Sequence, residues 1–229
     1  MGARTLLSRR TLLQRGVVLG AVAAAGGLAS CSSPRTPPAR PAAQASEDPT
    51  TTSTSSGRVL VAYFSRPGEN YYRGGRRNLD VGSTEVLARM VNDLIHADLH
   101  RIDAAEPYSD DYDATVARNV REQDSDARPA IANPLDSISQ YDTVLVGSPI
   151  WNVRPPMIMT SFLESHDFTA KTVHPFVTYA VSGLGRTEAV YSSALPGAWL
   201  QPGLAVQGEE ATDHRSAVEA WLRDAGLMA

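Results

Sequence analysis

The chain of 229 residues contains 42% hydrophobic and 20% charged residues, a composition that excludes wholesale disorder and gives room for one globular domain with additional segments. Its net charge of −4 conceals an asymmetry, because residues 58–229 hold 15 Lys and Arg against 23 Asp and Glu. So acidic a domain argues against nucleic acid as a partner, since binding to a phosphate backbone needs clustered basic residues.

The first 31 residues have the pattern of an export signal. Arg9 and Arg10 precede a weakly apolar run rich in Ala and Gly, which ends in Leu-Ala-Ser-Cys at residues 28–31. The paired arginines resemble a twin-arginine signal, and the last four residues resemble a bacterial lipobox. We therefore expect lipidation of Cys31 and a location at the outer face of the bacterial cytoplasmic membrane. A plain signal peptide or a short anchor helix is the alternative, although the run is shorter than the ~20 residues of a membrane span.

Residues 32–57 consist mainly of Ser, Thr, Pro and Ala and contain almost no large apolar side chain. Such a segment cannot bury a hydrophobic core, so we expect a disordered, flexible tether. The folded domain is therefore predicted to span residues 58–229.

The first part of this domain combines a strand, a polar loop and the start of a helix. Residues 59–64 (Val-Leu-Val-Ala-Tyr-Phe) form a continuous apolar run, which is typical of a parallel strand covered on both faces. After a Gly- and Arg-rich insertion at residues 67–81, Gly82, Ser83 and Thr84 lead into a predicted helix. Its apolar residues recur at helical spacing at Leu87, Met90, Val91, Leu94 and Ile95. Hydroxyl groups and free amides at a helix N-terminus make an anion-binding site.

Two common phosphate-binding motifs are excluded at this loop. A Walker A loop needs a lysine before its Ser or Thr, but the only lysine of the chain, Lys171, lies far away in the sequence. The dinucleotide-binding motif needs glycines directly after the strand, where Ser65, Arg66 and Pro67 stand instead. The remaining candidate ligand is a monoester phosphate held by hydroxyls and backbone amides.

Without the insertion, residues 61–66 (Val-Ala-Tyr-Phe-Ser-Arg) joined to residues 82–85 (Gly-Ser-Thr-Glu) resemble the first strand and phosphate loop of the flavodoxin-like family. This resemblance implies FMN as the cofactor. It assigns the FMN phosphate to five residues, namely Ser65, Arg66, Gly82, Ser83 and Thr84. The insertion departs from the family, and we expect either a flap whose arginines add positive potential beside the phosphate or a solvated loop.

The middle of the domain contains a second loop that points to a flavin. We predict a strand over residues 99–104, a polar helix over residues 110–123 and a strand over residues 143–147. The acidic residues around the helix are interpreted as a solvated face, because their spacing matches no calcium loop. The loop after the last of these strands resembles the flavin-stacking loop of a flavodoxin subfamily, whose members often carry a second Trp where this chain has Asn152. The resemblance implies that Pro149, Ile150, Trp151 and Asn152 border the flavin ring, and a core position is the alternative for Trp151.

The remaining elements complete an alternating pattern. We predict a helix over residues 156–165, a strand over residues 172–179 and a short fifth strand over residues 203–206. The loop after the fourth strand matches the second flavin loop of the family, which implies that Ser182, Gly183 and Gly185 bond the pyrimidine edge of the ring. A last helix is expected to be capped by Thr212 or Asp213 and to bury Trp221. Trp199 is also expected in the core.

The alternation of strands and helices predicts an α/β fold, namely a doubly wound, five-stranded parallel sheet of order 2-1-3-4-5 with helices on both faces. The resemblance implies an FMN-binding, flavodoxin-like redox protein that acts as an electron carrier or as an FMN-dependent reductase. Its partner would be a redox protein or a small-molecule electron acceptor, and no side chain is expected to act as a catalytic acid or base. No metal is expected, because the five histidines lack ligand spacing. A non-redox lipoprotein that retains the fold without flavin is the alternative.

Overall fold

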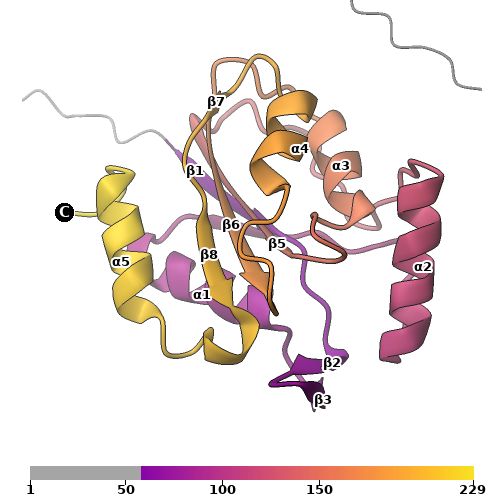
Figure 1. The fold of residues 1–229 in the computed structure, drawn as a ribbon. Coiled ribbons are helices and arrows are strands. Elements are labelled where there is room, and N and C mark those ends of the chain that lie inside the picture. Colours follow the sequence, from indigo (N-terminus) through magenta and orange to yellow (C-terminus); the bar gives the residue numbers. More distant parts are fainter. Residues whose placement is uncertain (1–57) are drawn as a thin grey trace, which may run out of the picture. The chain divides into compact units, whose positions relative to one another are not determined.

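The computed structural model describes residues 58–229, which form an α/β domain with a central sheet between two layers of helices (Figure 1). The predicted signal region over residues 1–31, with its Cys31, and the predicted tether over residues 32–57 lie outside the described residues. Within the described domain, no helix is both long enough and apolar enough to span a membrane.

The central sheet confirms the predicted strand order. Its strands are β1 (Val59–Tyr63), β4 (Asp98–Arg101), β5 (Thr143–Pro149), β6 (Thr172–Tyr179), β7 (Trp199–Leu200) and β8 (Leu204–Gln207). They follow the path β4-β1-β5-β6-β7, with β8 also paired to β6, and every pair is parallel. The fifth strand of the predicted order is therefore split into β7 and β8. Pro202 lies between the two pieces, and a proline has no N–H to donate to a strand ladder.

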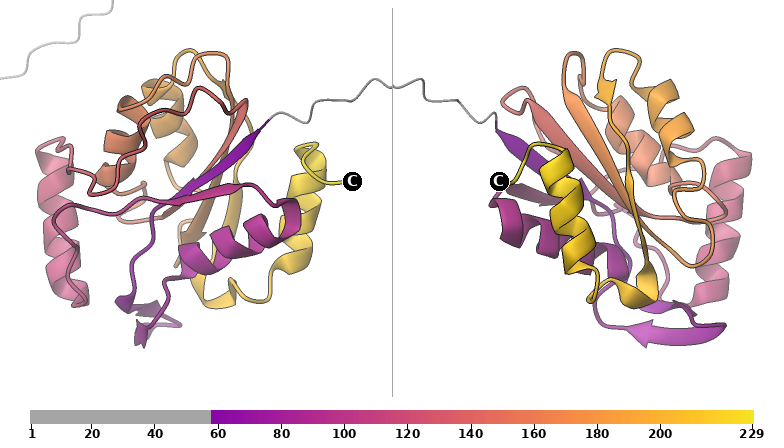
Figure 2. Two further views of the ribbon diagram at one scale, coloured as in Figure 1. Left: turned by 180° about the vertical axis from the view of Figure 1, so that it is seen from behind. Right: turned by 60° about the vertical axis from the view of Figure 1, so that its left-hand side comes forward.

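Helices cover both faces of the sheet, as the two views of Figure 2 show. On one face lie α1 (Ser83–Ile95) and α5 (Arg215–Asp224), and on the other lie α2 (Tyr112–Asp124), α3 (Met157–Glu164) and α4 (Thr187–Ala194). The alternation of side chains along β1 divides the core accordingly. Val61 and Tyr63 pack in the cluster under α1 and α5, whereas Leu60 and Ala62 pack in the cluster under α3 and α4.

The insertion between β1 and α1 is a β-hairpin rather than an irregular loop. Its strands, β2 (Gly68–Tyr72) and β3 (Gly75–Leu79), pair in the antiparallel direction. Arg73 and Gly74 connect them, and both have a positive φ, as the two central residues of a type I′ hairpin turn do. The hairpin follows the C-terminal end of β1, where parallel α/β sheets bind their ligands (Figure 1).

Several details correct the predictions. The second strand ends at Arg101 rather than at residue 104, and α4 was not predicted. The side chain of Trp199 is 63% exposed, so its core position is wrong, because β7 lies at the sheet edge and has only β6 beside it. The expected cap of the last helix is also wrong, since residues 211–213 form a turn and His214 precedes α5 without a capping side-chain bond.

Candidate functional site

The two ends of the hairpin insertion lie in contact, so residues 65–66 and residues 82–84 together form one loop at the C-terminal end of β1. A Cβ atom on Gly82 would lie 2.4 Å from both the backbone oxygen of Arg66 and Oγ of Ser65. A separation this short is below any normal contact, so only glycine allows the approach. The structure therefore brings Ser65 next to residues 82–84, although the 16 residues that contain the hairpin lie between Ser65 and Gly82 in the sequence.

Within residues 58–229, the first two backbone amides of α1 have no hydrogen-bond acceptor. Ser65 Oγ accepts a hydrogen bond from the amide of Glu85 at 3.1 Å. The amides of Ser83 and Thr84 precede the first possible intrahelical bond, so α1 itself offers them no acceptor. These two donors and the positive end of the helix dipole favour an anion at this position.

The hydroxyl groups around this helix start can also donate to an anion. Ser65 Oγ uses a lone pair to accept from Glu85, so its own hydrogen stays available. Thr84 Oγ1 and Thr178 Oγ1 lie 2.7 Å apart, and a bond between them consumes only one of their two hydrogens. Thr178 was not predicted, although its position near the C-terminal end of β6 is the kind of signal that could have identified it.

Arg66 has a different role in this structure from the one that the resemblance implies. Its guanidinium donates to the backbone oxygen of Ser109 at 2.7 Å and to that of Glu69. Only 7% of the residue is exposed, and this burial lowers the pKa of Arg66, while Asp110 and Glu69 act in the opposite direction. Arg66 thus links the hairpin to the loop before α2, and two of its three guanidinium nitrogens are bonded, while its buried Nε has no partner among the described residues.

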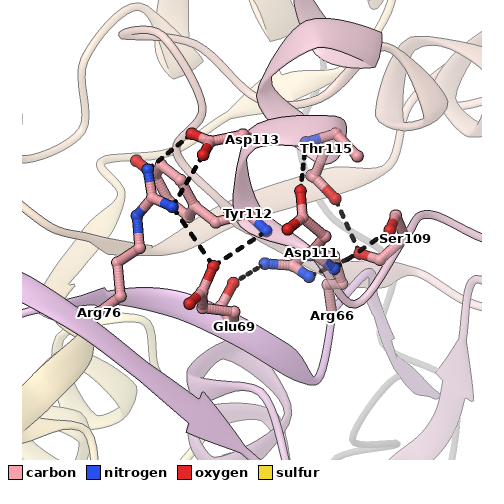
Figure 3. A network of polar contacts seen from close by, with 9 residues as sticks. Arg66, Glu69, Arg76, Ser109, Asp111, Tyr112, Asp113 and Thr115 are labelled. Atoms are coloured by element: carbon pink, nitrogen blue, oxygen red, sulfur yellow. Dashed lines mark hydrogen bonds and ion pairs between the residues drawn. The ribbon is translucent and has the colours of Figure 1, made fainter.

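A network of polar contacts fixes both strands of the hairpin to the N-terminus of α2 (Figure 3). Arg76 forms two bonds with the carboxylate of Asp113, at 2.6 and 2.9 Å, and its guanidinium lies 4.6 Å from the ring centre of Tyr112. The backbone of Glu69 donates to Asp110 at 2.8 Å, and its carboxylate accepts from the amide of Tyr112 at 3.3 Å. Arg76 is therefore engaged with α2 rather than with the anion site.

The turn of the hairpin is held at a second point. The amide of Arg73 donates to Oε1 of Glu209 at 2.9 Å, and Glu209 lies in the short 3-10 helix η1 (Gly208–Glu210) after β8. The hairpin therefore bridges α2 and η1. Glu209 also places a carboxylate in the wall of the cavity that contains the anion site, and this was not predicted.

A cavity of about 120 Å³ lies between the hairpin, the start of α1 and the ends of β5 and β6. The structure brings seven of the predicted site residues to its lining, namely Ser65, Arg66, Ser83, Thr84, Pro149, Ile150 and Trp151. It adds lining residues that were not predicted, namely Asn70, Tyr71, Tyr112, Thr178, Tyr179, Ala180, Gly208 and Glu209. Tyr179 and Ala180 follow the same strand-end rule as Thr178, whereas the hairpin residues carry no signal in the sequence.

Trp151 belongs both to the cavity wall and to the core. Its ring makes edge-to-face contacts with Phe64 and Tyr108, with ring centres 5.6 and 5.1 Å apart. Trp151 and Arg154 exchange backbone hydrogen bonds across a tight turn whose central residues, Asn152 and Val153, both have positive φ. Such a backbone is unusual for a β-branched valine and strains the turn.

The predicted second flavin loop packs against this turn. The amide of Arg186 donates to the backbone oxygen of Val153 at 2.8 Å, and a Cβ on Gly185 would lie 2.4 Å from the same oxygen. Ser182, Gly183 and Gly185 are accordingly not among the residues that line the cavity, and Asn152 lines a neighbouring groove instead. Tyr179 and Ala180, which precede these three residues in the chain, line the cavity instead.

Comparisons with known proteins agree with this geometry. A family model described as flavodoxin matches residues 58–225. A presumed flavoprotein from Bacteroides eggerthii DSM 20697 is 29% identical, with a TM-score of 0.60, over 73% of this chain and 96% of its own. Another, from Bacteroides uniformis ATCC 8492, is 30% identical, with a TM-score of 0.58, over 73% of this chain and 98% of its own. No curated protein matches the chain significantly.

Proposed function

We propose that this chain, which belongs to the flavodoxin family, binds FMN and acts as a redox protein, either as an electron carrier or as an FMN-dependent reductase. The observation that carries the proposal is the loop rebuilt from Ser65 and residues 82–84 at the start of α1. Two open amides and hydroxyl hydrogens converge there, which is the donor set that a monoester phosphate requires. The bound isoalloxazine would supply the redox chemistry.

The chain's own residues have distinct parts in this proposal. Ser65, Ser83 and Thr84 would hold the phosphate, while Ile150 and Trp151 would form the wall beside the ring. Glu209 lines the same cavity, and the amide of Arg73 gives its carboxylate a hydrogen-bond donor outside the anion site. The hairpin would therefore help to keep the anion site free of a competing carboxylate.

The test compares FMN with riboflavin, which is the same ring system without the phosphate. The absorption spectrum of the purified full-length protein shows whether flavin copurifies, and titration of flavin-free protein gives both affinities. We expect FMN to bind at least about tenfold more tightly than riboflavin, a difference of about 1.4 kcal/mol. Equal affinities for FMN and riboflavin would contradict the proposed phosphate site. If neither flavin binds, the alternative of a domain that keeps the fold without flavin would be favoured.

Ser83→Ala sharpens this test. Oγ of Ser83 makes no hydrogen bond with another described residue, so the substitution removes a donor without breaking a contact inside the domain. A hydrogen bond to a charged group contributes about 1.5–3 kcal/mol, so FMN affinity should fall about tenfold or more. Riboflavin affinity should stay unchanged, and a parallel fall of both would indicate a general disturbance of the loop.

We further propose that the protein is held at the outer face of the cytoplasmic membrane by a lipid on Cys31. The support is the sequence pattern of residues 9–31, since this segment lies outside the described residues. Cys31→Ser should abolish labelling by fatty acid and move the protein from the membrane fraction to the soluble fraction. Unchanged labelling and fractionation in the native host would contradict the anchor.

A further inference from the structure

A second cavity, of about 340 Å³, adjoins the proposed flavin pocket between α2 and residues 150–152, and we call it the α2 groove. It shares five lining residues with the flavin pocket, namely Arg66, Asn70, Tyr112, Ile150 and Trp151. The two cavities are therefore neighbours across a common wall. The volume of the groove, taken without the flavin pocket, lies at the lower end of the range of about 300–1,000 Å³ that is usual for small-molecule sites.

The helix that lines the groove has its apolar and polar faces reversed. Along α2, the buried residues are Thr115, Asn119 and Glu122, which are all polar. Val116 and Val120 lie one turn apart on the same face, and they are 42% and 41% exposed. A surface helix normally buries its valines, so this face of α2 has the composition of a surface that contacts an apolar partner.

The polar groups of the groove are suited to an uncharged ligand. Among the described residues, Arg66 is the only charged one that lines the groove. Two nitrogens of its guanidinium donate to backbone oxygens, and its buried Nε has no partner among residues 58–229. Asn119 is 3% exposed, and its Oδ1 accepts from Gln123 at 3.1 Å, whereas its Nδ2 donates to no acceptor among residues 58–229. Asn152 Nδ2 donates to Gln123 at 2.9 Å. The groove therefore offers an amide donor between two valines.

We propose that the α2 groove binds an uncharged, planar and mainly apolar molecule of about two fused rings that carries a hydrogen-bond acceptor for Asn119. The proposal rests on the proposed function, because such a molecule would be the small-molecule electron acceptor of the flavin. Ser65, Ser83 and Thr84 line the flavin pocket but not the groove, so the proposed phosphate donors lie on the pocket side of Ile150 and Trp151. The ligand would thus lie on the opposite side of this wall from the cofactor.

The test uses the oxidised full-length protein loaded with FMN, with 1,4-naphthoquinone as the probe and its 2-sulfonate as a charged counterpart. Binding is measured by calorimetry, and FMN release is followed by flavin fluorescence in the same samples. Val116→Glu and Val120→Glu place a carboxylate in the groove from exposed helix positions. Leu99→Glu, on β4 at 40% exposure, is the matched control outside the groove.

We expect 1,4-naphthoquinone to bind without releasing FMN and the sulfonate to bind more weakly. Each α2 variant should weaken naphthoquinone binding at least about tenfold, because a carboxylate cannot be buried unpaired, while FMN affinity and the Leu99→Glu variant stay unaffected. If the probe releases FMN, the groove is part of the cofactor site and the proposal is wrong. If the α2 variants bind naphthoquinone like the wild type, the probe does not bind in the groove and the proposal is also wrong. The same titration on flavin-free protein separates this result from a failure of FMN to bind.

Discussion

Gly82→Ala tests whether the phosphate loop depends on the close approach of the two ends of the insertion. The added Cβ would lie 2.4 Å from the backbone oxygen of Arg66, and real Cβ atoms essentially never approach other atoms within 3.0 Å. The loop must therefore open by at least about 0.6 Å, and backbone rather than a flexible side chain has to move. The φ of Gly82 is −68°, so the expected effect is steric and not conformational.

Overpacking of this kind typically costs about 1–3 kcal/mol, which corresponds to a fall of about 2–12 °C in melting temperature for a domain of this size. The displacement also moves Ser65 away from the start of α1, so FMN affinity should fall more than riboflavin affinity. Gly75→Ala is the matched control, because its Cβ would meet only the backbone oxygen of Tyr72, at 3.7 Å. Thermal melting and flavin titration measure both effects. A Gly82→Ala protein that melts and binds FMN like the wild type would refute the rebuilt loop.

Three further predictions concern other parts of the domain. Trp151→Ala should lower the melting temperature of the flavin-free protein and also weaken FMN binding, because the ring packs on Tyr108 and lines the cavity. Trp151→Phe should retain most of the stability and most of the FMN affinity, and if Trp151→Ala affects only one of these two properties, the ring serves only the core or only the cofactor. Burial lowers the pKa of His174, so the unfolded chain takes up a proton near pH ~6.5 that the folded domain does not, and stability should fall as pH drops from 7 to 5. His174→Phe should reduce this pH dependence in thermal melts without abolishing it, because burial also lowers the pKa of His100 and His166, and an unchanged slope would contradict the assignment. Asp113→Asn should leave the midpoint of denaturant unfolding nearly unchanged, because its ion pair with Arg76 is exposed and such pairs contribute little to stability. A clear fall of the midpoint would indicate that the hairpin network acts cooperatively.

The sequence predicted the sheet because its signal is local and strong. Residues 143–147 are mainly apolar, residues 172–179 are rich in β-branched and aromatic residues, and the strands β5 and β6 follow the predicted positions closely. The hairpin was not predictable in the same way. Residues 68–79 contain few large apolar residues, and the structure holds them by contacts with α2 and η1, which lie far away in the sequence.

The candidate site was predictable where it follows from strand ends and not where it depends on how loops pack together. Ser83 and Thr84 open the predicted helix α1, Trp151 follows the predicted strand β5, and all three line the cavity. The glycines after β6 were assigned from the resemblance, but their positive φ serves a turn that packs on Val153. The helix α2 gives a further example. Its buried residues are polar, and their spacing in the sequence does not distinguish them from residues on a solvated helix face.

The edges of the central sheet are short and interrupted. At one edge, β4 has only four residues, and Asp98 and Arg101 carry charges at its two ends. At the other edge, Pro202 separates β7 from β8, so no long row of unpaired N–H groups is presented on that side. Exposed, continuous strand edges are the usual templates on which folded domains join into aggregates. The architecture of these edges should therefore allow many copies of the domain to crowd together and still stay separate, because neither edge offers a second sheet enough backbone to extend.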